Sequence, residues 1–85
     1  MKRTIPTFPK YRQVLDNGNI RIVTIVTYKY KVTAACKEFR EGYEDADDAR
    51  FYHMTFRRTL AKETTAQLKQ KAMEYYNVKE EERIN

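Results

Sequence analysis

The chain has 85 residues, of which 41% are hydrophobic and 34% charged, and its formal net charge is +5 at pH 7. This length suits one small domain, and the apolar content is too high for full disorder. One cysteine excludes an internal disulfide, the absence of serine excludes any serine nucleophile, and no apolar stretch suits a signal peptide or membrane span. We therefore expect a cytoplasmic protein without membrane contact, located in the host cytoplasm if the protein is viral. The positive net charge predicts an anionic partner.

Residues 1–9 are predicted to form an extended arm, because both prolines lie there and proline cannot donate a hydrogen bond to a sheet. A β-hairpin over residues 10–32 follows. Its signal is Asn17-Gly18, since a type I′ turn requires positive φ at both central residues. With these two residues as the loop, Gln13 pairs with Ile22 and Tyr11 with Thr24.

The second strand of this hairpin, Ile20–Val32, is the longest run of β-branched and aromatic residues in the chain, although thirteen residues suggest a bend or bulge. Side chains alternate between the two faces of a strand. One face is predicted to build the core and carries Ile20, Ile22, Val26, Tyr28, Tyr30 and Val32. The other face carries Arg21, Val23, Ile25, Lys29 and Lys31.

The middle of the chain is less regular. Residues 33–42 are read as a short helix capped by Thr33, with a strand running out into a loop as the alternative. Residues 41–48 hold five acids and no base, which predicts an acidic loop. Residues 50–60 fit both strand and helix spacing, and their aromatic content favours a strand.

The last element is a helix over residues 65–76. Thr64 and Gln67 form a capping box, in which each side chain bonds to the other residue's backbone amide. Leu68, Ala72 and Tyr75 lie on one stripe and are expected to cover the core, and residues 78–85 are expected to form a solvated tail. The sequence thus predicts an α+β fold, with a β-hairpin, a third antiparallel strand and a C-terminal α-helix in a single domain over residues 1–85.

The cations of the predicted hairpin indicate a nucleic-acid site. They lie on one sheet face together with threonines, and such side chains bind phosphates and base edges. The predicted DNA- or RNA-binding residues are Lys10, Arg12, Arg21, Lys29, Lys31 and Arg57. The predicted order of three strands followed by a helix resembles that of the arm-binding domains of tyrosine recombinases and of AP2-type DNA readers. The resemblance is in the order of elements alone, and no residue motif is shared.

A second hypothesis is a protein-binding inhibitor or adaptor of viral or mobile-element origin. Its contact residues would be Val23 and Ile25, two aliphatic side chains on an outward face, together with Glu44, Asp45, Asp47 and Asp48 of the acidic loop. The same outward face, or a strand edge, predicts a homodimer.

Enzymatic chemistry is not expected. Cys36 and His53 could form a nucleophile and base, but no orienting residue or oxyanion site accompanies them. The acids lack the spacing of a calcium loop, and two isolated glycines do not make a phosphate loop. We predict no cofactor and no metal site.

Overall fold

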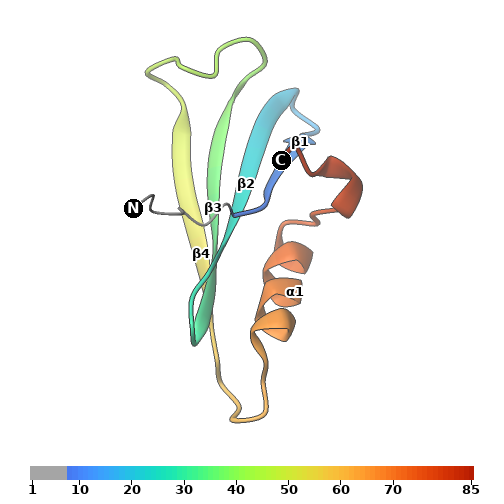
Figure 1. Ribbon diagram of the computed structural model, residues 1–85. Helices are drawn as coiled ribbons and strands as arrows, with labels where there is room; N and C mark the ends of the chain where they lie inside the picture. The colour runs from blue at the N-terminus through green and yellow to red at the C-terminus, as the bar shows by residue number, and fades with distance from the viewer. Residues whose placement is uncertain (1–7) are drawn as a thin grey trace, which may run out of the picture.

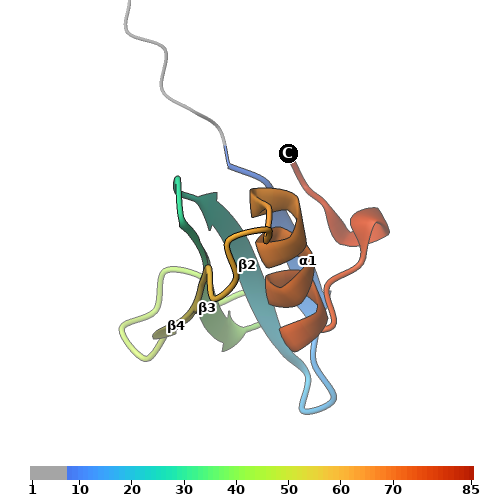
Figure 2. The ribbon, with the colours of Figure 1, turned by 90° about the horizontal axis from the view of Figure 1, so that it is seen from below.

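The computed structural model describes residues 8–85, so most of the predicted arm, residues 1–9, lies outside the described residues. The fold is α+β and has two layers, a sheet and one helix that covers one of its faces (Figures 1 and 2). The elements are β1 (Lys10–Val14), β2 (Asn19–Thr27), β3 (Lys31–Arg40), β4 (Arg50–Arg57) and α1 (Thr65–Tyr75). All neighbouring strands are antiparallel and follow one another in chain order. The sheet has one strand more than predicted. Within the described residues, no helix is long and apolar enough to cross a membrane.

The first hairpin differs in register from the prediction. Tyr11 pairs with Val23, whereas an Asn17-Gly18 loop would pair it with Thr24. The loop is one residue longer, 16–18, and only its glycine has positive φ, +86°. The glycine amide bonds at 2.9 Å to the carbonyl three residues before it, as in a type I turn followed by a glycine bulge. A shift of one residue changes which β2 side chains share a face with those of β1.

The buried face of β2 is consequently the opposite of the predicted one. Val23 and Ile25 have 0% exposed surface and pack with Leu68 and Ala72 of α1. The prediction that these two side chains face outward as a protein-contact surface is wrong. The predicted homodimer therefore cannot form through them. Of the predicted core side chains, Ile20 and Val32 are buried, Ile22 and Val26 are only half-buried, and Tyr28 and Tyr30 are exposed.

The predicted strand over residues 20–32 is interrupted by a tight turn. The Tyr28 N–H donates to the Lys31 carbonyl at 2.9 Å, so the chain reverses at Lys29 and Tyr30. Residues 31–40 then form β3, and the short helix predicted for 33–42 is wrong. The β3 backbone pairs with β2 on one side and with β4 on the other.

The C-terminal helix follows the prediction closely. The Gln67 N–H donates to Thr64 Oγ1 at 3.2 Å and the Thr64 N–H donates to Gln67 Oε1 at 2.8 Å, which confirms the capping box. Leu68 and Ala72 are buried as expected. Met73 fills the place predicted for Tyr75, which is 57% exposed. The strand predicted for 50–60 is confirmed over Arg50–Arg57.

The C-terminal segment is not a solvated tail. It contains a short 3-10 helix, η1 (Glu80–Glu82), and then runs along the outer edge of β1. The Ile84 N–H donates to the Lys10 carbonyl at 2.9 Å, and Tyr11 forms an isolated antiparallel bridge with Arg83. This segment covers the β1 edge, so β4 is the sheet edge that no other described segment pairs with.

Candidate nucleic-acid interface

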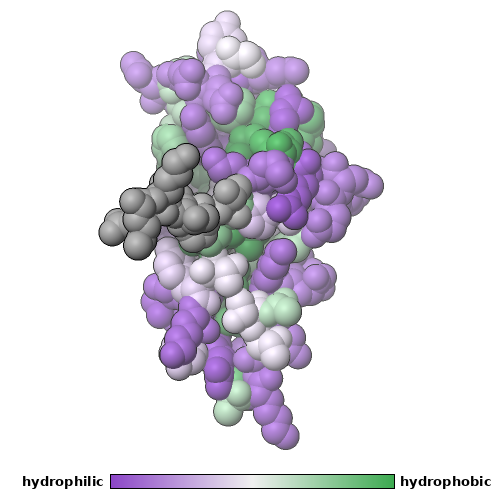
Figure 3. All heavy atoms as spheres, viewed as in Figure 1, coloured by the Kyte–Doolittle hydropathy of each residue, from purple (hydrophilic) through white to green (hydrophobic). Residues whose placement is uncertain are grey.

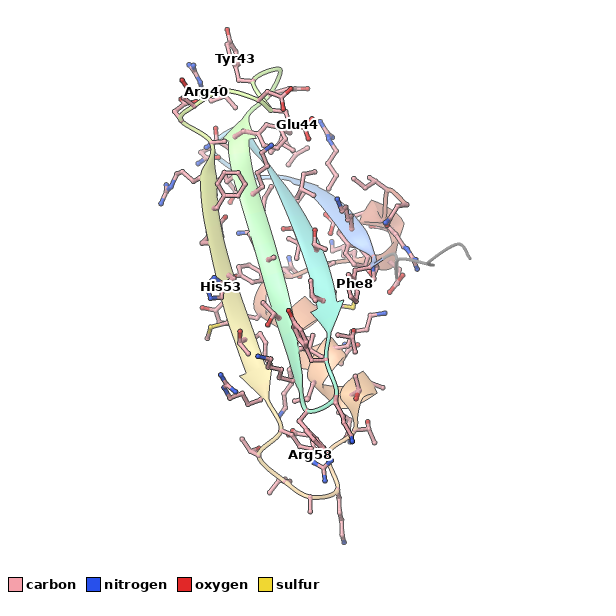
Figure 4. All side chains as sticks on the ribbon, turned by 60° about the vertical axis from the view of Figure 1, so that its left-hand side comes forward. Phe8, Arg40, Tyr43, Glu44, His53 and Arg58 are labelled. Carbon is pink, nitrogen blue, oxygen red and sulfur yellow. The ribbon has the colours of Figure 1, made fainter. Side chains whose placement is uncertain are left out.

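The face of the sheet away from α1, here called the open face, is built from alternate residues of all four strands. Figure 4 views the molecule with this face forward and the helix behind. The strand pairing places on it Lys10, Arg12, Val14, Ile20, Ile22, Thr24, Val26, Lys31, Thr33, Ala35, Lys37, Phe39, Phe51, His53, Thr55 and Arg57.

The open face carries one sign of charge along its strands. Five of its strand positions are cations, Lys10, Arg12, Lys31, Lys37 and Arg57, and none is a carboxylate. Glu38 is the one carboxylate within the four described strands, and it lies on the α1 side. There the Asn19 amide donates to it at 2.9 Å and the Tyr52 hydroxyl at 2.7 Å. These hydrogen bonds hold the pKa of Glu38 below its usual value.

The centre of the open face has short side chains. Thr24, Thr33, Ala35 and Thr55 are half-buried there, and the Thr33 and Thr55 hydroxyl oxygens lie 3.0 Å apart. Hydroxyls of this kind can donate to phosphate oxygens or exchange hydrogen bonds with base edges. Because these side chains are short, an extended ligand can approach the sheet closely between the longer cations.

The end of the sheet at the β2–β3 turn, here called the basic tip, consists of Tyr28, Lys29, Tyr30, Lys31, Arg57 and Arg58, which line a shallow hollow of about 560 Å³. Figure 4 places Arg58 at this lower end. Lys31 Nζ lies 4.8 Å from the Tyr28 ring centroid, and Lys29 Nζ lies 5.3 Å from that of Tyr30. The hollow has four cations among its lining residues and no acid.

The opposite end of the sheet carries the acidic loop, residues 41–48, which connects β3 to β4 at the top of Figure 1. Three successive turns build it, with N–H donors at Tyr43, Ala46 and Ala49. Part of the loop folds against the open face, where it helps to bury Ile20 and Phe39. The ten residues of β3 separate loop and tip by about 30 Å, at roughly 3.3 Å per residue.

The structure brings most of the predicted nucleic-acid residues together. Lys10, Arg12, Lys31 and Arg57 share the open face, and Lys29 lies beside them at the basic tip. The prediction for Arg21 is wrong, because the register shift turns it to the α1 side. Its guanidinium donates to Gln13 Oε1 at 2.8 Å and lies 4.9 Å from the Tyr76 ring centroid. Arg21 therefore holds the end of α1 against the sheet.

The side chains that the sequence analysis missed are Lys37, Arg58 and the exposed rings beside them. Lys37 was assigned to a helix, although Lys31, Thr33, Ala35 and Lys37 alternate with apolar residues at the period of a strand. Arg58 follows the end of β4, and its guanidinium donates to the Ala61 carbonyl at 2.7 Å.

The two residues considered for nucleophilic chemistry are separated by the sheet. Cys36 is buried on the α1 side, whereas His53 is exposed on the open face. Burial raises the pKa of the Cys36 thiol, which disfavours the reactive thiolate. Among residues 8–85, no group of three or more His, Cys, Asp or Glu side chains is placed to hold a metal ion.

Figure 3 shows a surface on which hydrophilic side chains dominate, with a hydrophobic area over the end of the sheet near the β1–β2 connection.

In comparisons with protein-family models, curated proteins and solved structures, nothing matches the chain.

Proposed function

We propose that this chain is a small, non-enzymatic, cytoplasmic protein that binds nucleic acid, in a regulatory or architectural role, through the open face and the basic tip. The observation that carries the proposal is the segregation of charge. The open-face strand positions hold five cations and no carboxylate, and two further cations, Lys29 and Arg58, continue this surface at the tip.

Phosphates supply the binding energy in this proposal. Each neutralised phosphate releases condensed counterions, which favours binding at low salt. The threonine hydroxyls at the centre of the face add hydrogen bonds to the backbone or to bases. Antiparallel β3 and β4 hold these groups on a rigid, hydrogen-bonded surface, so little ordering of the protein is needed on binding.

The test is the affinity for a fluorescein-labelled oligonucleotide as a function of salt. If four to five phosphates are neutralised, the slope of log affinity against log salt should lie between about −3 and −4.5, at roughly 0.7 to 0.9 per phosphate. If neither a duplex nor a single-stranded oligonucleotide binds measurably at low ionic strength, the proposal is contradicted.

The acidic loop supports a second candidate function, binding of a basic protein by an inhibitor or adaptor of viral or mobile-element origin. Glu44, Asp45, Asp47 and Asp48 are all exposed, and the ordered turns present them together. In this case a fourfold variant, Glu44→Gln, Asp45→Asn, Asp47→Asn and Asp48→Asn, should lose the partner in a pull-down. Its affinity for nucleic acid should rise rather than fall, because Glu44 lines a hollow of the open face with Lys10 and Lys37, where its carboxylate repels a bound phosphate.

A homodimer remains a proposal through the β4 edge, which no other segment of residues 8–85 pairs with, rather than through the sheet face. The Arg58 N–H donates to the Tyr30 carbonyl at 3.0 Å, so by alternation the backbone groups of Phe51, His53 and Thr55 point outward. Sedimentation of the wild type should show a dimer at micromolar concentration, and His53→Pro, which removes an outward N–H, should be monomeric. A monomeric wild type would contradict the proposed homodimer.

A further inference from the structure

Three aromatic side chains stand exposed on or beside the open face. Phe51 is 75% exposed, Tyr30 56% and Tyr28 48%. Phe51 lines a hollow at the upper part of the open face together with Ile22, Thr24 and Ala35, and Glu44 of the acidic loop lines the same hollow opposite Lys10 and Lys37. Tyr28 and Tyr30 lie at the basic tip. A large ring that is three-quarters exposed on a rigid strand contributes little to folding, and its face is free to contact a ligand.

Each of these rings has a cation beside it. Lys37 Nζ lies 5.7 Å from the Phe51 ring centroid, Lys31 Nζ lies 4.8 Å from that of Tyr28, and Arg58 Cζ lies 5.5 Å from that of Tyr30. The surface therefore offers two stations, one at each end of the open face, and each combines a flat apolar ring with a positive charge. Proteins that bind single strands pair the same two elements, a ring for the base and a cation for the neighbouring phosphate.

The width of the sheet argues against a duplex. Strands lie about 4.8 Å apart, so the outer strands of this sheet are separated by about 14 Å before their side chains are counted. The major groove of B-DNA is about 12 Å wide and admits a helix or a two-stranded ribbon. With four strands and α1 on its other face, the sheet is wider and thicker than such a ribbon. Bases paired inside a duplex also cannot stack on the rings.

We propose that the nucleic acid bound by the open face is single-stranded, with one base stacked on Phe51, another on Tyr28, and the backbone following the cations between them. This inference rests on the proposed function and specifies its ligand. The path from Phe51 to Arg57 covers six residues of β4, about 20 Å at roughly 3.3 Å per residue. It passes the exposed His53 and the Thr33–Thr55 pair, so several nucleotides lie between the two stations.

The experiment measures binding of the full chain to labelled oligothymidylate, oligouridylate and a duplex of equal length, each about 15 nucleotides, near the upper end of known single-strand site sizes. The single strands should bind at least tenfold more tightly than the duplex. Phe51→Ala and Tyr28→Ala should each weaken single-strand binding roughly 5- to 150-fold, the range that the loss of one stacked base gives. The salt slope should stay unchanged, because no phosphate contact is removed.

Two matched variants serve as controls. Phe51→Tyr keeps the ring and should bind like the wild type. Leu60→Ala removes an exposed apolar side chain of similar size, 68% exposed, which lines a hollow with residues of α1, and it should also bind like the wild type.

The outcomes separate this inference from the proposed function. Duplex binding that equals or exceeds single-strand binding, with no effect of the two ring variants, overturns the inference and leaves nucleic-acid binding intact. The absence of binding to all three oligonucleotides overturns the proposed function, and the inference with it. The ratio of oligouridylate to oligothymidylate affinity then shows whether RNA or DNA is preferred.

Discussion

Replacing Val23 with lysine is expected to unfold the domain. The Val23 side chain has no exposed surface and lies in the core cluster with Tyr11, Leu68 and Ala72. An ammonium group at this position would lose several kcal/mol of hydration without a partner. The whole domain has a free energy of unfolding of roughly 4 to 13 kcal/mol, at about 0.05 to 0.15 kcal/mol per residue. One such substitution therefore removes most or all of the stability.

The matched control is Val26→Lys, three positions further along the same strand. Val26 lies on the open face and is half-buried, so its lysine can extend into solvent and the variant should stay folded. Circular dichroism with thermal melting distinguishes the two variants. If Val23→Lys folded normally while Val26→Lys did not, the faces of β2 would be reversed, as the Asn17-Gly18 register implied.

The second large effect is expected from the row of cations beside the basic tip. Lys31 and Arg57 are directly paired across β3 and β4 on the open face. Changing both to alanine should weaken oligonucleotide binding roughly 10- to 100-fold near 50 mM salt, and the salt slope should shrink by about 1.4 to 1.8 because two phosphate contacts are lost. The loss should be similar for all base sequences, since contacts to phosphates carry no sequence information.

A control for net charge is available on the other side of the molecule. The double variant Lys69→Ala, Lys79→Ala removes the same number of positive charges, one from α1 and one from the residue before η1, where Lys79 lies near Gln13 and Arg21 on the α1 side. Its salt slope should equal that of the wild type, and its affinity should fall by no more than about threefold through long-range attraction. Equal losses in the two double variants would mean that net charge, and not the open face, governs binding.

Local signals in the sequence predicted the strand β4 and the start and buried stripe of the helix α1 well. The capping box at Thr64 and Gln67 and the stripe of Leu68 and Ala72 need only neighbouring residues, and all four behave as expected. The aromatic content of residues 50–60 likewise favoured a strand, which forms over Arg50–Arg57. Hydrogen bonding within a helix turn and side-chain preference for a strand are properties of short segments, which explains this success.

The predicted register of the first hairpin was wrong for a physical reason that the sequence did not reveal. Asn17-Gly18 suits a two-residue loop, yet Asp16 joins it, and one extra residue is enough to exchange the faces. The turn at Lys29 and Tyr30 contains no glycine or proline, so no turn signal interrupted the long run of β-branched and aromatic residues. Missing that turn also hid β3 and moved the predicted core to the wrong side.

Part of the candidate site could be predicted from the sequence, because the positions of its cations follow the alternation of side chains along a strand. Lys10, Arg12, Lys31 and Arg57 were predicted from charge and strand alternation, and they share the open face. Arg21 was misplaced by the same one-residue shift that buried Val23. The stations formed by Phe51 and Tyr28 could not be predicted, since they combine residues from β4 and from the β2–β3 turn with cations of β3.

The most direct test of binding through the open face is chemical-shift mapping with the ¹⁵N-labelled chain, titrated with oligothymidylate at low salt. The largest amide shifts are expected at Thr33, Ala35, Phe51 and His53 and at the basic tip, while the amides of α1 stay within the scatter of the unaffected residues. Shifts that cluster on α1 or on the acidic loop, with the open face unchanged, would contradict the account.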